Sequence, residues 1–400
     1  MLRAMSDLDA FALAARQIEI DRDATAQIPL HFARKKARLS PSPHAFLRGS
    51  APLFYEILSR RPELGAGPEG DGWIVGDMHL ENVGAYRDAG DDVVFGLDYF
   101  DEAARGPLRL DVLRLAVSVL LAARGIRVPG REAITELEHL IGAYLKALAG
   151  GPPPPRPAVV SSLLLQARDR NKRELLDERA PLGPAGKRRF ARGERYLDLP
   201  PELEARVPAL LAAYVAALGD HAPGRASEWA VEDAALRAAG IGTLGVVRIA
   251  MLVRDHAGDP RLVELKEAKQ PSIERLAGLP TQAFTHPGER VVEAARALLS
   301  SPPRHLAAVA LDGRSFAGRR LFPQEDKLTV DSITSLAALE ERVTLIGHLL
   351  GAAHAHGLTA LRAPTPKPWS AADVAAILDH AVELAGMMEG AYLAWVRRVG

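Results

Sequence analysis

Residues 76–82, GDMHLEN, are the stretch from which the fold of this chain can be argued. They directly follow residues 73–75, WIV, a short apolar run that predicts a strand. Asp77 and Asn82 would therefore lie in one loop after this strand, where they offer a carboxylate and a carboxamide. Phosphoryl transfer requires such groups, because a carboxylate orients the attacking hydroxyl and accepts its proton while an oxygen ligand holds magnesium. The alternative is a strand-ending turn in which Asp77 caps the backbone and His79 packs inward.

A second apolar run, residues 92–97, ends in acidic residues. A strand that delivers an Asp beside the first loop would supply a further magnesium ligand. Asp98 and Asp101 are the candidates, together with Asn82, and Glu102 competes with them.

The next segment, residues 108–124, is mostly apolar with isolated charges and predicts a buried helix. Asp111 on this helix resembles the Asp that braces the catalytic loop of kinase-like folds through hydrogen bonds. An (i, i+3) ion pair with Arg114 is the alternative.

A glycine-rich motif, GIGTLGVV, occupies residues 240–247. Glycine lets backbone amides approach the phosphates of a nucleotide. We expect a helix over 231–239 and a strand over 245–253, the reverse of the order around a dinucleotide-binding motif. With Val247 the motif instead completes GxGxxGxV, the glycine loop of kinases. The candidate nucleotide-binding residues are Gly240, Gly242, Thr243 and Gly245.

Lys266 lies on the next predicted strand, residues 262–266, where kinases carry the lysine that neutralises phosphate charge. Glu289 or Glu293, on a helix predicted over 288–299, would pair with it, and Glu293 joins the predicted nucleotide-binding residues. A surface lysine on a strand edge is the alternative.

Two histidines, His354 and His356, suggest a metal site. No two further ligands stand at metal-binding spacing, so satisfied histidines near a helix end are the preferred interpretation.

The composition is that of a globular protein. Of the 400 residues 48% are hydrophobic and 25% charged, and 50 Lys and Arg balance 50 Asp and Glu. This balance favours neither a nucleic-acid nor a membrane partner. The chain has no cysteine, which excludes disulfides and thiolate zinc sites and suits a cytoplasmic location. No signal peptide is recognisable, and no apolar run reaches the ~20 residues that span a bilayer.

Residues 150–157, GGPPPPRP, predict a stiff connector. The predicted organisation is a catalytic-loop half of the larger lobe (1–149), this connector, a helical segment (158–230), a β-rich nucleotide-binding lobe (231–328) and C-terminal helices that complete the larger lobe (329–400).

The pattern Gly-Asp-x-His-x-x-Asn at 76–82 resembles that of aminoglycoside- and choline-kinase-like enzymes. Several further motifs resemble an uncharacterised bacterial family, domain of unknown function 2252. They lie at residues 42–49 (SPHAFLRG), 76–84, 100–102 (FDE), 106–107 (GP), 111–118 and 266–268 (KEA). The family's usual Phe-Asp-x-Asn-Asp-Phe-Asp-Glu reads FGLDYFDE at 95–102, which removes one or two acidic groups.

The resemblance to kinases implies an α+β fold with two lobes, rich in helix. The order of the motifs is unusual, because the catalytic loop precedes the glycine loop and the lysine. A circular permutation explains this order and predicts that Asp77 and Lys266 meet in one cleft.

We therefore expect an ATP- and magnesium-dependent phosphotransferase that acts on a small-molecule hydroxyl. Asp77, His79 and Asn82 would be its catalytic residues, with Asp77 as the base. The alternative is a non-catalytic nucleotide-binding protein, which the loss of acidic groups at 95–102 favours. A metallophosphoesterase would need an Asn-His pair, and the sequence has none.

Overall fold

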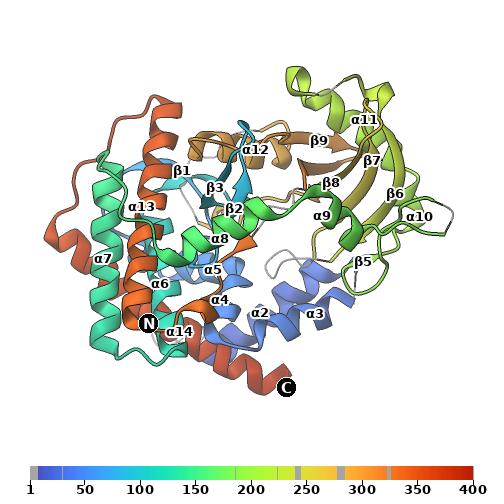
Figure 1. The fold of residues 1–400 in the computed structure, drawn as a ribbon. Helices are drawn as coiled ribbons and strands as arrows, with labels where there is room; N and C mark the ends of the chain where they lie inside the picture. Colours follow the sequence, from blue (N-terminus) through green and yellow to red (C-terminus); the bar gives the residue numbers. More distant parts are fainter. Residues whose placement is uncertain are drawn as a thin grey trace.

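The computed structural model describes residues 8–399 apart from 29, 185, 223, 239–244, 277–283 and 322–325. It shows an α+β protein in which a group of long helices (α6, α7, α13 and α14) lies on one side and a six-stranded sheet on the other (Figure 1). Helix α8 and helix α9 run between these two parts.

The helices of the described part of the chain are α2 (Ala10–Thr25), α3 (Leu30–Leu39), α4 (Pro43–Arg48), α5 (Ala51–Arg60), α6 (Arg109–Gly125), α7 (Gly130–Leu148), α8 (Ala158–Asp169), α9 (Lys172–Arg179), α10 (Pro201–Glu204), α11 (Val207–Ala217), α12 (Pro287–Leu298), α13 (Leu336–Leu361) and α14 (Ala371–Val399). Short 3-10 turns lie at Pro62–Gly65, Gly219–His221, Ala226–Glu228, Ser272–Arg275 and Val330–Ser332.

The strands form three antiparallel sheets. Their bounds are β1 (Asp71–Ile74), β2 (Val83–Arg87), β3 (Val93–Leu97), β4 (Ala104–Pro107), β5 (Tyr196–Leu197), β6 (Ala230–Arg237), β7 (Arg248–Arg254), β8 (Pro260–Glu267), β9 (Ala307–Leu311), β10 (Arg314–Arg320) and β11 (Asp326–Lys327). The large sheet has the order β5-β6-β7-β8-β10-β9, the second has β11-β2-β3, and the third pairs β1 with β4.

Helix α13 packs unusually close to helix α7, and two glycines on α13 permit it. A Cβ at Gly347 would lie 2.4 Å from the carbonyl oxygen of Leu140, and one at Gly351 would lie 2.2 Å from that of Tyr144. Any larger residue would therefore push the two helices apart.

The segment 231–239 does not form the predicted helix. Residues 231–237 lie in strand β6, which pairs with β5 on one side and β7 on the other and buries Ala235 and Leu236. Alanine, leucine and arginine favour a helix locally. That preference is weak, and the hydrogen bonds that β6 forms along both of its edges outweigh it. The glycine-rich segment consequently connects two neighbouring antiparallel strands.

The other predicted elements are present with shifted ends. The helical segment after the connector is divided into α8 and α9, because Asn171 caps α9 in a capping box with Glu174. The connector itself contains neither helix nor strand at residues 151–157.

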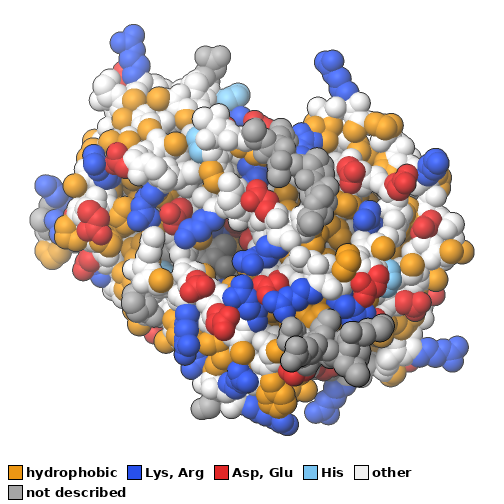
Figure 2. Space-filling model, turned by 180° about the vertical axis from the view of Figure 1, so that it is seen from behind, with side chains coloured by type: hydrophobic (Ala, Val, Ile, Leu, Met, Phe, Trp, Pro, Cys, Tyr) orange, Lys and Arg blue, Asp and Glu red, His pale blue; other side chains and the backbone are white. Residues whose placement is uncertain are grey.

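Charged side chains of both signs are interspersed over the face shown in Figure 2, and neither sign covers it alone. This distribution agrees with the balanced composition of the chain. Among the described helices, none combines the length and the apolar character needed to cross a membrane.

Candidate active site between the loop after β1 and the six-stranded sheet

One face of helix α6 holds the loop that follows strand β1. Asp111 accepts hydrogen bonds from two successive backbone amides, Val75 N at 2.6 Å and Gly76 N at 2.8 Å. Ser118, seven residues further along the same face, accepts one from Leu80 N at 3.1 Å. The predicted brace from Asp111 to the loop is therefore present.

The brace is supported from behind by two other helices. His354 Nε2 on α13 lies 3.1 Å from Asp111 Oδ2, and its Nδ1 lies 3.0 Å from the hydroxyl of Tyr144 on α7. All three side chains are buried. Both ring nitrogens of His354 thus have partners, as expected of a satisfied histidine rather than a metal ligand.

Arg114, between Asp111 and Ser118 on helix α6, pairs with the candidate base Asp77 and not with Asp111. Its Nε donates to Asp77 Oδ1 at 2.9 Å, and a second ion-pair contact reaches the same oxygen. Arg114 is fully buried, donates to the carbonyl of Leu47 at 2.9 Å and lies over the ring of Phe54. Both contacts end on Oδ1 of a side chain that is 22% exposed, and neither of them uses Oδ2.

His79, the second predicted catalytic residue, is buried beneath the loop. Its Nδ1 accepts a hydrogen bond from Glu81 N at 3.1 Å. Burial, with the nearby charge of Arg48, lowers the pKa of His79 well below its usual value, so the ring is neutral at pH 7. This neutral ring supports the turn of the loop.

Asn82 connects the loop to the segment after strand β3. Its Nδ2 donates to the carbonyls of Asp77 and Tyr99, both at 3.2 Å, and its Oδ1 accepts from Tyr99 N at 2.9 Å. A metal ion on Oδ1 would have to share that oxygen with the amide of Tyr99.

Two lysines from distant parts of the chain pair with the two candidate aspartates. Lys266 on β8 forms an ion pair with Asp101, and Lys327 on β11 lies 2.7 Å from Asp98. Both ammonium groups also approach the ring of Tyr99, at 5.3 Å and 3.5 Å from its centre.

The pairing keeps both aspartates ionised. Burial alone would raise the pKa of Asp98 and Asp101, but the charges of Lys327 and Lys266 outweigh it, and both pKa values fall below the ordinary value. Burial also lowers the pKa of Lys266, to about 8, against the opposing effect of Asp101.

Glu102, the third acidic candidate, is used elsewhere. Its Oε2 accepts a hydrogen bond from Ser272 N at 2.5 Å. Burial and the nearby Asp77 raise its pKa. Asp98 and Asp101 line the neighbouring cavities, whereas Glu102 is in the lining of neither.

The segment carrying Asp101 is itself anchored by a buried arginine of helix α12. Arg290 donates to the carbonyl of Asp101 at 2.8 Å and to that of Lys269 at 2.7 Å, and it also reaches Ala103 O. The backbone around Asp101 is thereby joined to the end of strand β8.

A cavity of about 660 Å³ opens at these residues, with Asp98, Tyr99 and Lys327 in its lining. Three arginines in its lining, Arg237, Arg248 and Arg319, converge on the buried carboxylate of Glu264, which lines the neighbouring narrow cavity. The lining of the larger cavity contains six Arg and Lys and four Asp and Glu.

The predicted glycine residues can be placed only in part. Gly240, Gly242 and Thr243 lie outside the described residues. Gly245 has a φ of 127°, and a Cβ there would lie 2.5 Å from the carbonyl of Ala24 at the end of α2. Close packing and backbone conformation thus both require glycine at this position.

Strand β7 begins at the end of the sheet where Lys266 lies. Arg248, the first residue of β7, pairs in register with Lys266. Glu293 is exposed on α12 near Arg105, and Glu289 accepts a hydrogen bond from Thr285 N. The structure thus gives Lys266 a different acidic partner, Asp101.

Two contacts of the site, those of Lys327 and of Arg114, are not predicted by the sequence motifs. Lys327 stands in no motif and reaches the site because the two-residue strand β11 pairs with β2. The spacing of Arg114 on its helix predicts an ion pair with Asp111 and not the pair with Asp77. Arg114 lies one turn after Asp111 on the buried face of α6, and this position is consistent with a contact between Arg114 and the same loop.

A family model described as "Uncharacterized protein conserved in bacteria (DUF2252)" matches residues 27–159 and 156–398. The chain belongs to this bacterial family. The matched segments meet at the end of the proline-rich connector and contain all the cleft residues described above. No curated protein and no solved structure matches the chain.

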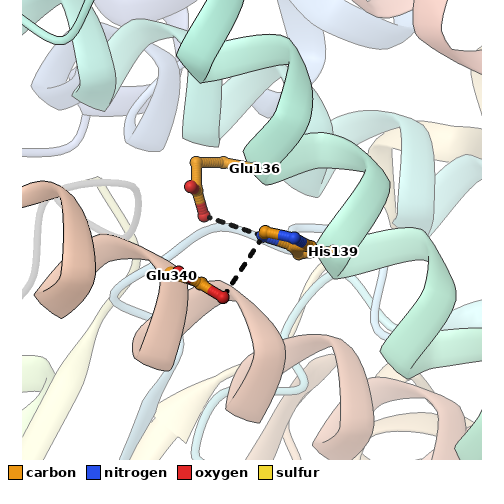
Figure 3. A group of neighbouring side chains, drawn as sticks. All are labelled: Glu136, His139 and Glu340. Atoms are coloured by element: carbon orange, nitrogen blue, oxygen red, sulfur yellow. Dashed lines mark ion pairs between the residues drawn. The ribbon is translucent and has the colours of Figure 1, made fainter.

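Besides the cleft, the described part of this family member contains one group of three potential metal ligands (Figure 3). His139 Nδ1 lies 3.5 Å from Glu136 Oε2 on the same helix, α7, and 3.8 Å from Glu340 Oε1 on α13. The group shares no residue with the cleft. The group thus lies between α7 and α13, with His139 within ion-pairing distance of one carboxylate on each helix.

Proposed function

We propose that this protein is a kinase-like phosphotransferase that uses ATP and magnesium to phosphorylate a hydroxyl of a small molecule. The observation that supports it most is the joining of two distant segments. Lys266 pairs with Asp101, and Asn82 ties the neighbouring Tyr99 to the loop of Asp77. The proposal includes a two-lobed fold in which the catalytic loop precedes the nucleotide-binding sheet, as a circular permutation would produce.

Lys266 would bind the phosphates of the nucleotide. It stands at the end of β8 next to Arg248. At pH 7 it is protonated, because its pKa of about 8 still lies above that pH. A phosphate would replace Asp101 as the partner of its ammonium group.

Asp98 and Asp101 fit a magnesium ion by their chemistry, since both are ionised carboxylates in the lining of the same cleft. The ammonium groups of Lys266 and Lys327 contact these carboxylates in the structure, at positions that would also attract a metal cation. When bound, magnesium would neutralise phosphate charge. Asn82 would contribute its Oδ1 beside the hydrogen bond from Tyr99.

Asp77 would orient the acceptor hydroxyl and accept its proton through Oδ2. The pairing of Oδ1 with Arg114 fixes the direction of the carboxylate. A fixed direction suits a reaction where positioning matters more than proton abstraction.

The test is an Asp77→Asn variant, which keeps the shape of the side chain and removes its charge. Turnover of ATP in the presence of a panel of hydroxyl acceptors should fall at least about a hundredfold, while ATP affinity stays within about twofold. Loss of ATP binding in this variant would show that Asp77 has a structural role instead.

A non-catalytic nucleotide-binding protein is the second candidate. The hydrogen bonds of both polar atoms of Asn82 to backbone groups and the reduced acidic content of residues 95–102 favour it. Nucleotide binding without magnesium-dependent ATP consumption, across the same acceptor panel, would decide for this alternative.

A further inference from the structure

The three side chains drawn in Figure 3 lie between helices α7 and α13. They are Glu136, His139 and Glu340, and we refer to them as the interhelix group. A ligand atom of each lies within 4.8 Å of those of the other two. We propose that the interhelix group binds a zinc ion that joins the two helices. This inference does not depend on the proposed phosphotransfer.

The two helices hold the three ligands in place. Glu136 and His139 stand three residues apart on α7, a spacing that puts both on one face of a helix. Figure 3 shows them pointing toward Glu340, which lies on α13. Because α13 packs closely against α7 at Gly347 and Gly351, the ligands of the two helices are kept at a defined separation.

The distances within the interhelix group fit ligands of one ion better than hydrogen bonds. His139 Nδ1 lies 3.5 Å from Glu136 Oε2 and 3.8 Å from Glu340 Oε1. An N–H···O hydrogen bond spans about 2.7–3.2 Å, and Nδ1 has no hydrogen-bond partner in the described part of the chain. Zinc bonds of about 2.1 Å in a tetrahedral site place two ligand atoms about 3.4 Å apart. Small side-chain shifts would therefore complete the coordination.

The burial of Glu136 is an independent indication of a cation. Its side chain is 3% exposed, and its Oε2, the atom nearest to His139, has no hydrogen-bond partner among the described residues. No Lys or Arg in that part of the chain forms an ion pair with it. Other buried carboxylates do have such a partner, as Asp21 has Lys35 and Glu264 has Arg237. Since a buried charge needs a partner or a metal, Glu136 calls for a cation.

The donor atoms favour zinc over the other common divalent ions. One imidazole and two carboxylates are ligands that zinc accepts, whereas magnesium and calcium take oxygen ligands. The side chains of His139 and Glu340 are 40% and 53% exposed, so water has access to a fourth position. A proton on His139 is the other cation that could serve the group. It would leave both carboxylates beyond hydrogen-bond distance, while a zinc ion would bind all three side chains.

A zinc ion at this position would be structural. Glu136 lies in the second turn of α7 and Glu340 in the second turn of α13. Further along the same two helices, Tyr144 contacts His354, which supports Asp111. Zinc would thus add a second link between the helices that support the brace, and we expect it to stabilise the fold.

The experiment is a calorimetric titration with ZnCl₂ of protein that has been stripped with EDTA, freed of the chelator and of any histidine tag, and kept without ATP. Wild type should bind one zinc ion per chain. His139→Gln and Glu340→Gln should each bind it at least about tenfold more weakly. Glu341→Gln is the matched control, because Glu341 is the next residue of α13, is also exposed and is outside the group. Its affinity should equal that of wild type.

Thermal unfolding of the same proteins gives a second readout. Zinc should raise the melting temperature of wild type and Glu341→Gln, and raise that of Glu340→Gln much less, because an ion that binds the folded state stabilises it. Excess MgCl₂ should not displace the zinc.

Three results would overturn the inference. They are absence of zinc binding to wild type, equal zinc binding by wild type and both ligand variants, and displacement of the zinc by magnesium. A wild-type melting temperature that zinc leaves unchanged and that His139→Gln lowers would assign the group to ion pairing through a protonated histidine instead. Because neither ATP nor magnesium is needed for zinc binding, a failure of the phosphotransfer proposal leaves these results unaffected.

Discussion

Lys266 Nζ and Asp101 Oδ2 form an ion pair across 165 residues of sequence. Lys266 is at the end of a strand in the large sheet, whereas Asp101 follows the small β2–β3 hairpin packed against the helices. The pair therefore connects the large sheet to the segment that follows strand β3. Its ammonium and carboxylate are the two groups that a nucleotide and its metal would separate.

Replacing Asp101 tests which acidic group serves magnesium. In Asp101→Asn, magnesium should no longer raise ATP affinity, a loss of about tenfold or more, because an amide is a poor substitute for the carboxylate. Without magnesium the affinity should not fall, since Lys266 is released from its competing partner. Calorimetry with and without MgCl₂ measures both. If magnesium still raises the ATP affinity of Asp101→Asn as it does that of wild type, Asp101 is not a magnesium ligand. Asp98→Asn, measured in the same way, tests the other candidate.

The affinity for ATP should decrease at alkaline pH. Because burial lowers the pKa of Lys266 to about 8, its positive charge is present below that pH and is lost above it. Affinity should therefore be level near pH 7 and fall by up to about tenfold per pH unit above 8. An affinity that holds constant between pH 7 and 9.5 in wild type would disagree with a lysine that binds phosphate.

The Asp111→Asn variant should unfold more easily. Two buried backbone amides, Val75 N and Gly76 N, donate to this carboxylate, and an Asn side chain can accept from only one of them in the same orientation. We expect a loss of about 2–3 kcal/mol in the free energy of unfolding by urea. Asp379→Asn, on the exposed side of α14, should change it by less than about 0.5 kcal/mol. Equal stability of the two variants would show that the brace contributes little.

Two glycine substitutions in helices should have opposite effects. Gly351→Ala should destabilise the protein by about 1–3 kcal/mol, because its Cβ would lie 2.2 Å from the carbonyl of Tyr144. Gly386→Ala on α14, with no atom within 4 Å of the added carbon, should stabilise it by up to about 1 kcal/mol. Thermal unfolding of both variants measures the contrast. Similar shifts in the two melting temperatures would mean that α7 and α13 are less tightly packed than described.

Much of the site could be predicted from local sequence. The loop 76–82 after a strand, the bracing Asp111 and the acidic end of β3 are all short-range patterns, and the structure contains each of them. The family resemblance that these motifs suggested is confirmed by the match over residues 27–159 and 156–398.

The rest depends on contacts between distant segments. Strand β6 has a helix-favouring composition and becomes a strand only because β5 and β7 lie on either side of it. Lys327 reaches Asp98 through a strand of two residues, too short to leave a periodic pattern. The choice of Arg114 between Asp77 and Asp111 depends on where the loop lies, which helical spacing does not determine.

The most direct test of the account is a calorimetric titration of wild-type protein and Lys266→Met with ATP, with and without magnesium. Lys269→Met is the matched control, because Lys269 is three residues away and 49% exposed. The account predicts that wild type and Lys269→Met bind ATP, more tightly with magnesium, and that Lys266→Met binds it at least about tenfold more weakly. No binding to wild type in either condition, or equal binding by Lys266→Met, would contradict it.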